Sequence, residues 1–204
     1  MERLVVARHA EAESNLGMTV SGVAPGGALT PAGVEQARAL GRALADDGVE
    51  LAVVTELRRT AETVDIALGG RAVPRLVLPE LNEIRFGRFE GGLLADYRAW
   101  AWAAPADELC PGGGESRGEA AGRYARAFGT LLERPEAVIL AVTHAVPIRY
   151  LLRAHEGLPP QARIESVPHA EPFRLDASAV RDAVALLESW AREPAFAEAQ
   201  VEPE

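Results

Sequence analysis

The feature that most constrains the fold is a regular alternation of short apolar runs with longer amphipathic segments. Apolar runs cover about residues 3–8, 51–55 and 137–144, and each is short enough to form a strand. The run at 137–144 is continuously apolar, which is typical of a strand that is buried on both faces. Strands that alternate with helices favour a mostly parallel sheet with helices on both of its faces.

The predicted helices carry recognisable boundary signals. The segment 29–48 has Thr30 as its predicted N-cap and Pro31 at the first helical position, and Gly48 is expected to end it. Thr55 is expected to cap a helix that runs to about residue 68. Further helices are predicted over 92–104, 115–134, 147–155 and 177–192, and weaker strands over 73–81 and 171–176.

These elements predict an α/β fold, specifically a three-layer α/β/α sandwich with a mostly parallel central sheet and a small helical cap or lid. We expect a single domain over residues 1–195, with the lid within about residues 92–115. The last residues, 196–204, are acidic and poorly patterned, so a disordered tail is expected there.

Composition and charge exclude several functional classes. The net charge of −9 argues against nucleic acid or an anionic membrane as partner, since both need a basic face. No apolar run approaches the roughly 20 residues of a membrane span, and no leader pattern is present, so a cytoplasmic location is expected. The single cysteine, Cys110, cannot form an internal disulfide. The chain has no lysine, which excludes a phosphate-loop lysine and Schiff-base chemistry.

Polar and charged residues follow the apolar runs at the point where each strand is expected to end. Because the carboxyl ends of parallel strands meet at one edge, where ligands bind in such sheets, these side chains are expected to converge. The set consists of Arg8, His9, Thr55, Arg58, Arg59, Glu83, Thr143 and His144. Each has a structural alternative, and a lone histidine after a strand is more often a structural hydrogen-bonding group. Together, the arginine forks and a helix start match the oxygens of a phosphate group.

Six short blocks occur in a fixed order along about residues 3–152. They are "RHAEAESN" (8–15), "LTPAGVEQA" (29–37), "TELRRTAET" (55–63), "LNEIRFGRFEG" (81–91), "PGGGES" (111–116) and "THAVPIRYLL" (143–152). Together these blocks resemble the motifs of the histidine phosphatase superfamily, the group that includes cofactor-dependent phosphoglycerate mutase. The chain departs from the family pattern at Ala10 and Ala145, which replace glycines, and at Glu56, which replaces a proline.

The resemblance implies a role for each matching residue. His9 would be the nucleophile that becomes phosphorylated, and Glu83 would donate a proton to the leaving oxygen. Arg8, Arg59 and His144 would bind the transferred phosphoryl group. The expected substrate contacts are Asn15, Ser21, Gly22 and Ala145. No metal and no cofactor are expected, because the arginines supply the positive charge.

The implied activity is a phosphomonoesterase that acts on a small phosphorylated metabolite through a phosphohistidine on His9. His9 must be neutral to attack, so its cationic neighbours should lower its pKa, and a local backbone carbonyl should hold its second ring nitrogen. A bound phosphate should raise the pKa of Glu83. The arginines also predict a positive pocket on an otherwise acidic surface.

Two other functions stay open at the level of sequence. A cofactor-dependent phosphoglycerate mutase is one, but the short chain and the loop 16–28, which has no basic residue, favour hydrolysis. A non-catalytic module that binds phosphate or a phosphoprotein is the other, although both His9 and Glu83 are present.

Two further features have alternative interpretations. The aromatic cluster of Tyr97, Trp100 and Trp102 would form a lid that favours a substrate with an apolar or ring-containing body, or else serve ordinary packing or a dimer contact. A homodimer is therefore compatible with the sequence. His169 either takes the place of a small or asparagine residue near the family's site or is a loop histidine, and the second interpretation is favoured.

Overall fold

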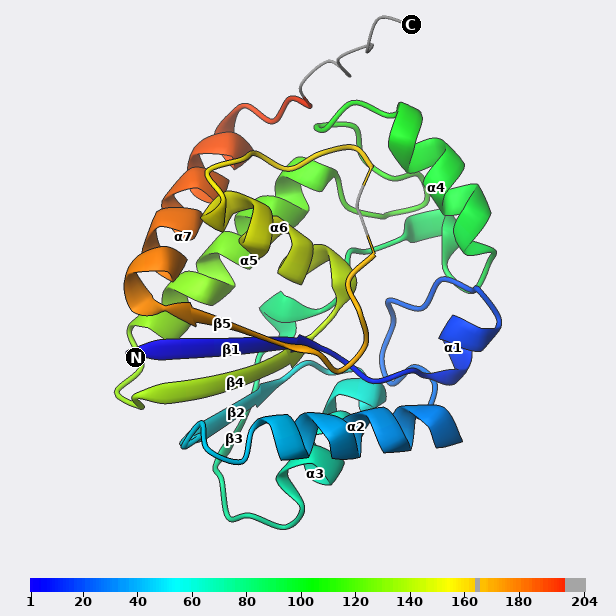
Figure 1. The fold of residues 1–204 in the computed structure, drawn as a ribbon. Helices are drawn as coiled ribbons and strands as arrows, with labels where there is room; N and C mark the ends of the chain where they lie inside the picture. Colours follow the sequence, from blue (N-terminus) through cyan, green and yellow to red (C-terminus); the bar gives the residue numbers. More distant parts are fainter. Residues whose placement is uncertain (164–165, 197–204) are drawn as a thin grey trace, which may run out of the picture.

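The computed structural model describes residues 1–163 and 166–196. Within them, five strands form one sheet in the order β3-β2-β4-β1-β5 (Figure 1). The strands are β1 (Arg3–Arg8), β2 (Leu51–Val54), β3 (Arg75–Val77), β4 (Val138–Thr143) and β5 (Pro172–Asp176). The first four are parallel to one another and β5 is antiparallel to β1, which confirms the mostly parallel sheet.

The direction of β5 follows from the path of the chain after β4. Helix α6 (Ala145–His155) leads away from the carboxyl end of β4, and the chain then returns to that same edge. There the Ala170 N–H donates to the Arg8 carbonyl at 2.9 Å. A strand that begins at this edge and pairs with β1 has to run antiparallel to it.

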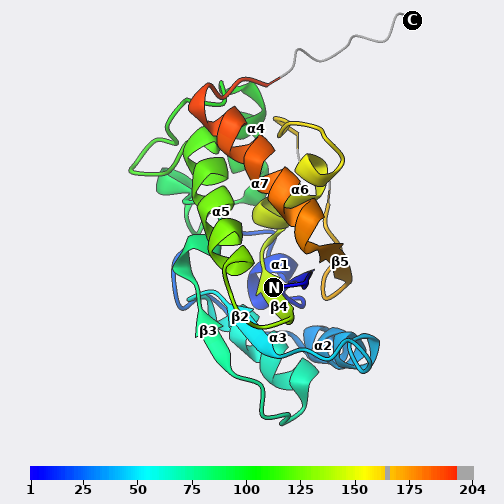
Figure 2. The ribbon, with the colours of Figure 1, turned by 90° about the vertical axis from the view of Figure 1, so that its left-hand side faces the viewer.

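Helices cover both faces of the sheet, which confirms the three-layer sandwich (Figure 2). One face carries α2 (Pro31–Ala43) and α3 (Arg58–Leu68), and the other carries α6 with α5 (Arg117–Leu132) and α7 (Ala177–Arg192). Alternate strand residues point to opposite faces. Leu4 and Val6 therefore belong to the core beneath α5, α6 and α7, whereas Val5 and Ala7 belong to the core beneath α2 and α3.

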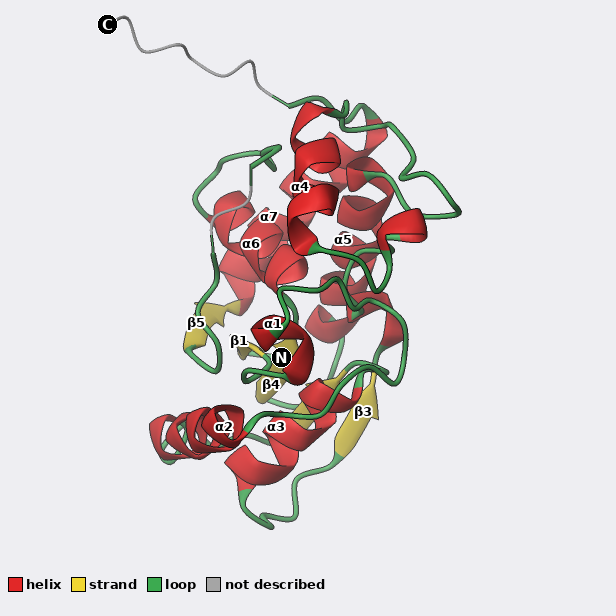
Figure 3. Cartoon of the chain, turned by 90° about the vertical axis from the view of Figure 1, so that its right-hand side faces the viewer, coloured by secondary structure: helices red, strands yellow, loops and turns green. Residues whose placement is uncertain are grey.

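Two helices lie at the carboxyl ends of the parallel strands (Figure 3). They are α1 (Glu13–Leu16) and α4 (Leu94–Ala103), the second of which falls in the predicted lid segment. Two 3₁₀ turns, η1 (Pro79–Leu81) and η2 (Gly87–Phe89), connect β3 to α4. Neither α1 nor η2 was expected from sequence, because segments this short have too few residues for a periodic pattern.

Helix boundaries agree with the sequence signals only in part. The Thr30 hydroxyl accepts from the Gly33 N–H at 2.9 Å and Pro31 begins α2, as predicted. Helix α2 ends at Ala43, however, and Gly48 lies beyond it in a turn with φ of 68°. Thr55 does not cap α3, whose N-cap is Leu57. The predicted tail lies almost wholly outside the described residues.

None of the helices in the described ranges combines the length and apolar character that crossing a bilayer requires.

Candidate active site

A cavity of about 150 Å³ opens at the carboxyl ends of the strands, where the sequence places its polar residues. Its walls come from the end of β1, from α3 and α4, from the first residues of α5 and α6, and from the segments around α1, after η1 and after α6. Within the described residues, the charged groups that line it are Arg8, Arg59, Glu83, Arg98 and Arg117. Four guanidinium groups face one carboxyl, so the cavity is suited to an anion although the whole chain is acidic.

His9 lies directly after β1 and is buried, with its two ring nitrogens held by different partners. Its Nδ1 is 2.7 Å from the Ala10 carbonyl oxygen, which can only accept, so Nδ1 carries a proton. Its Nε2 accepts from the Nε–H of Arg59 at 3.0 Å. The hydrogen bond from Nδ1 to a local backbone carbonyl agrees with the sequence expectation. It leaves Nε2, which carries the lone pair, as the reactive atom.

The surroundings of His9 keep its ring neutral. Burial lowers the pKa of His9 well below its ordinary value, and the positive charges of Arg59 and Arg8 lower it further. The hydrogen bond to the Ala10 carbonyl acts in the opposite direction and is weaker. A neutral imidazole with a free lone pair is the form that can act as a nucleophile.

Arg59 connects the parts of the site from the first turn of α3. Besides His9, its Nη2 donates to the Ser21 carbonyl at 2.8 Å and to Nδ1 of His144 at 3.2 Å. Its Nη1 lies 3.4 Å from the Ser21 hydroxyl. Its guanidinium is therefore oriented by protein groups alone.

His144 lies directly after β4, fully buried, with its ring centroid 5.3 Å from that of His9. Because Nδ1 accepts from Arg59, Nε2 carries the proton and donates to the Thr55 hydroxyl at 3.0 Å. Thr55 in turn lies 3.1 Å from the Thr60 hydroxyl, which donates to the Leu57 carbonyl. Because the Thr55 hydroxyl takes part in this series of hydrogen bonds, it does not cap α3. Burial, then the charge of Arg59, lower the pKa of His144 well below its ordinary value.

Glu83 lines the cavity from the segment after η1. Its Oε1 accepts from the Ile84 N–H at 3.1 Å. Burial raises the pKa of Glu83 above its ordinary value, although the Ile84 N–H and the charges of Arg59 and Arg8 oppose that rise. A carboxyl with a raised pKa is suited to donate a proton near neutral pH.

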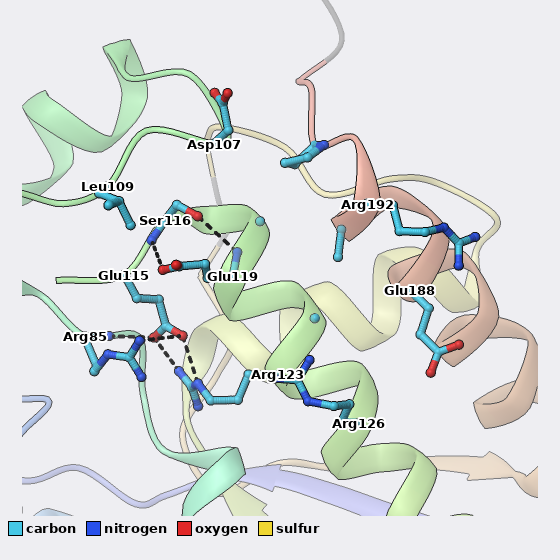
Figure 4. Close-up of a pocket in the computed structure, with 14 residues that line it drawn as sticks. Arg85, Asp107, Leu109, Glu115, Ser116, Glu119, Arg123, Arg126, Glu188 and Arg192 are labelled. Carbon is cyan, nitrogen blue, oxygen red and sulfur yellow. Dashed lines mark hydrogen bonds and ion pairs between the residues drawn. The ribbon is translucent and has the colours of Figure 1, made fainter.

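Arg123 fixes the backbone that carries Glu83. It forms a two-point ion pair with buried Glu115, with contacts of 2.9 and 2.6 Å. It also donates to the carbonyls of Glu80, Asn82 and Glu83 at 2.8, 2.9 and 3.3 Å. Figure 4 shows this pairing, with Arg85 beside Glu115, on the wall of a separate open groove of about 910 Å³ between α5 and α7.

The structure brings together most of the residues that the sequence marks as substrate contacts. Asn15, Ser21 and Ala145 line the cavity, although the Asn15 Oδ1 also accepts from the Ala12 N–H at 2.9 Å. Gly22 lies behind the wall, where a Cβ would come within 2.9 Å of the Phe86 ring, and its N–H donates to Glu90. The close approach of the Phe86 ring, rather than a substrate contact, explains a glycine at this position.

The aromatic residues of α4 divide between two roles. Tyr97 and Trp102 line the cavity, and Trp102 is 44% exposed at its rim. Trp100 packs beside Tyr97 and Phe89, with ring centroids 5.9 Å from each. Tyr97 and Trp102 therefore contribute to the cavity wall, whereas Trp100 packs against neighbouring rings.

His169 is a neighbour of the site that the sequence analysis assigned to a loop. Its Nδ1 lies 2.8 Å from the His9 carbonyl, and its ring centroid is 5.5 Å from that of His9. Its backbone forms a bridge with Arg8, just before β5 begins. The resemblance offered His169 a place near the family's site as the less favoured interpretation, and the contact itself depends on the return of the chain to the end of β1.

Comparison with known proteins is consistent with this geometry. The family model of the histidine phosphatase superfamily (branch 1) matches residues 4–178. An adenosylcobalamin/alpha-ribazole phosphatase of Escherichia coli is 32% identical over 171 residues, which cover 78% of this chain and 82% of that protein. The corresponding protein of Salmonella typhimurium is 41% identical over 88 residues, 43% of each chain. A 2,3-bisphosphoglycerate-dependent phosphoglycerate mutase of a Methylobacterium species is 31% identical over 188 residues, which cover 84% of this chain and 87% of that protein.

Solved structures give the same family. A putative alpha-ribazole-5'-P phosphatase from Escherichia coli superposes with a TM-score of 0.75 and 29% identity, covering 86% of this chain and 90% of the other. The alpha-ribazole phosphatase of Shigella flexneri superposes with a TM-score of 0.73 and 30% identity, covering 85% and 90%.

Proposed function

The chain belongs to the histidine phosphatase superfamily, branch 1, and we propose that it hydrolyses a small phosphate monoester through a phosphohistidine on His9. The observation that carries this proposal is the state of the His9 ring. Its Nδ1 is tied to the Ala10 carbonyl and its Nε2 presents a lone pair beside Arg59 and His144. A purely structural histidine would not need two arginines that disfavour its protonation.

In the first step, His9 Nε2 attacks phosphorus and the bond between phosphorus and the ester oxygen breaks. Glu83 transfers its proton to that oxygen, so the leaving group departs as an alcohol. The incoming phosphoryl oxygens replace His9 Nε2 as the acceptor for the Arg59 Nε–H, which frees the lone pair for attack. Arg8 and Arg59 compensate the charge of the equatorial oxygens.

In the second step, water attacks the phosphohistidine. Glu83, now ionised, takes a proton from that water as the new bond between oxygen and phosphorus forms and the bond to Nε2 breaks. The products are inorganic phosphate, neutral His9 and a protonated Glu83, so the site returns to its starting state. The positive charge that this chemistry needs comes from the arginines of the cavity wall.

The relatives suggest which substrates to test first. Several of them are named alpha-ribazole phosphatases, so alpha-ribazole phosphate is the first natural compound to test. We also expect the protein to work in the cytoplasm, as one domain over residues 1–195, and a homodimer is compatible with this function.

Mutase activity is the second candidate, because relatives named phosphoglycerate mutase cover most of this chain. Incubation with 3-phosphoglycerate and bisphosphoglycerate tests it. Isomerised product without release of inorganic phosphate would favour the mutase over hydrolysis.

Turnover of p-nitrophenyl phosphate tests the proposal directly. We expect hydrolysis by the wild type, and a loss of more than about 1,000-fold in His9→Ala because the nucleophile is removed. His155→Ala, which replaces an exposed histidine at the end of α6, is the matched control and should retain activity. An absence of turnover by the wild type between about pH 5 and 8 would favour the non-catalytic binding module.

A further inference from the structure

One buried hydroxyl in the cavity has no hydrogen-bonding partner among the described residues. It belongs to Tyr97, which lies on α4, lines the cavity and is only 5% exposed. Its ring is fixed by an edge-on contact with Phe86, with centroids 4.7 Å apart, and by Trp100. Buried hydroxyl groups are normally satisfied, and leaving one without a partner costs stability. A packed, preoriented and unsatisfied hydroxyl on a cavity wall points to a ligand group that completes it.

A buried guanidinium lies on the same cavity wall. Arg117 begins α5, is only 3% exposed, and donates to the Tyr150 hydroxyl at 2.6 Å and to the Gln161 carbonyl at 3.3 Å. In the described part of the chain, no carboxylate lies within ion-pair distance of it. Arg123, on the same helix, is paired with Glu115. A buried cation without an acid partner is costly, and an oxygen acceptor in the cavity would compensate it.

Tyr97 and Arg117 line the same cavity as His9 and Glu83, so one substrate can contact all four. Burial raises the pKa of the Tyr97 phenol, and the charges of Arg117 and Glu83 both act on it. Tyr97 therefore stays protonated and can donate, within electrostatic range of the carboxyl that would protonate the leaving oxygen. Leu94 and Ala101 of α4 add apolar surface for the carbon atoms of a leaving group.

We propose that Tyr97 and Arg117 form a second polar subsite that binds an oxygen acceptor on the leaving group. This inference rests on the proposed phosphatase activity and adds its substrate class. The preferred substrates are phosphate monoesters of polyols or hydroxy acids, whose leaving groups carry a hydroxyl or a carboxylate beyond the ester oxygen. Phosphate esters of plain alcohols offer no such acceptor to the Tyr97 hydroxyl or to Arg117.

Three substrates with the same carbon chain length test the subsite. Propyl phosphate has no second oxygen, glycerol 1-phosphate carries hydroxyls, and 3-phosphoglycerate carries a hydroxyl and a carboxylate. The measurement is kcat/KM for release of inorganic phosphate, expressed as the ratio of each oxygen-bearing substrate to propyl phosphate. The two arms separate a hydroxyl from a carboxylate as the preferred acceptor.

We expect Tyr97→Phe to lower both ratios by roughly 3- to 10-fold, the effect of one hydrogen bond. Arg117→Gln should lower the 3-phosphoglycerate ratio more than the glycerol 1-phosphate ratio. Tyr124→Phe is the matched control, since the Tyr124 hydroxyl is buried on α5, outside the cavity lining, within 3.4 Å of Arg123. It should leave both ratios as in the wild type.

Thermal unfolding provides a second readout that does not depend on catalysis. Because the Tyr97 hydroxyl has no partner among the described residues, Tyr97→Phe should unfold at the same temperature as the wild type or higher. A clear fall in Tm would show that the hydroxyl is already satisfied, which would overturn the subsite.

The possible outcomes distinguish a failure of the proposed subsite from a failure of the proposed phosphatase activity. Ratios that are unchanged in Tyr97→Phe, in an enzyme that hydrolyses the three esters, would overturn the subsite alone and leave the phosphatase standing. No phosphate release from any ester or from p-nitrophenyl phosphate by the wild type would overturn both.

Discussion

At the scale of single residues, the reactivity of this site is set by how the neighbours of His9 and Glu83 shift two pKa values in opposite directions. Burial and two arginines lower the pKa of His9, whereas burial raises that of Glu83. The nucleophile His9 is then neutral and the acid Glu83 protonated at the same pH, which is the combination that the first step needs.

Replacing the acid should have an effect that depends on the leaving group. We expect Glu83→Gln to lower kcat about 10²- to 10⁴-fold for alkyl phosphates, which need a proton on the leaving oxygen. The loss should be smaller for p-nitrophenyl phosphate, whose leaving group departs as a stable anion. Glu80→Gln, an exposed acid on the same segment, is the control. Equal losses for both kinds of substrate would show that Glu83 is not the proton donor.

The pH dependence of kcat/KM follows from the same two residues. Glu83 acts in its protonated form, so activity should fall as the pH rises through its raised pKa. His9 acts in its neutral form, and its lowered pKa means that activity should persist below about pH 6.5, the ordinary value for histidine. Glu83→Gln should remove the alkaline limb of the profile. An acid limb near pH 6.5 that belongs to His9 would contradict this account.

At the scale of elements, the chemistry depends on how firmly the segment after η1 is held to α5. Arg123 donates to three backbone carbonyls there, those of Glu80, Asn82 and Glu83, while its ion pair with Glu115 holds its own position. The Ser116 hydroxyl caps α5 by accepting from the Glu119 N–H at 3.0 Å, which fixes the helix that carries Arg123. Glu83 is thus placed by a helix that is remote from it in sequence.

Substitution of Arg123 tests this positioning role. Arg123→Lys keeps the charge but loses the guanidinium that binds Glu115 at two points. We therefore expect the free energy of unfolding to fall by roughly 1–3 kcal/mol. We also expect kcat to fall more for alkyl phosphates than for p-nitrophenyl phosphate, because Glu83 is displaced. Arg126→Lys, an exposed arginine on the same helix, should change stability by less than about 0.5 kcal/mol. An equal fall in kcat for both substrates would limit Arg123 to a structural role.

The sequence predicted elements well where a continuous apolar run or a complete cap was present. Strands β1, β2 and β4 and the start of α2 at Thr30 are examples. It failed where tertiary contacts override local preference. Thr55 is a residue type that often caps helices, but its hydroxyl forms hydrogen bonds with His144 and Thr60 instead. The antiparallel direction of β5 depends on a return of the chain that no local pattern encodes.

The positions of the site residues, like those of the helices and strands, were predicted only in part. His9, Arg8, Arg59 and Glu83 come together at one sheet edge because parallel strands present their carboxyl ends on the same side. The position of His169 beside His9 was only the less favoured interpretation, and nothing in the sequence predicted the unsatisfied hydroxyl of Tyr97. Both depend on packing between segments far apart in the chain, which a pattern of residue types does not specify.

At the scale of the whole molecule, the buried histidines couple folding to pH. His9 and His144 have pKa values well below the ordinary histidine value, chiefly through burial and then through Arg59. The unfolded chain therefore binds more protons than the native protein as the pH falls below about 6.5. The stability that their neutral state contributes is present above that pH and is lost towards acid.

Urea unfolding at about pH 7.5 and pH 5.5 checks this linkage. We expect the free energy of unfolding to fall at the lower pH, and to fall less in His144→Gln, which lacks one of the two groups. In His155→Gln, which replaces an exposed histidine, the free energy of unfolding should fall as much as in the wild type. A pH dependence that is identical in all three proteins would assign the effect to other groups.

The most direct test of the central claim is to identify the phosphorylated atom during turnover. Wild-type enzyme mixed with p-nitrophenyl phosphate, stopped rapidly in alkali and digested, should yield one phosphorylated peptide, with the phosphate on the ring of His9 when analysed by mass spectrometry. The peptide should be absent from His9→Ala. Phosphate on a different residue, or continued turnover by a wild type that never carries phosphate on His9, would contradict the account.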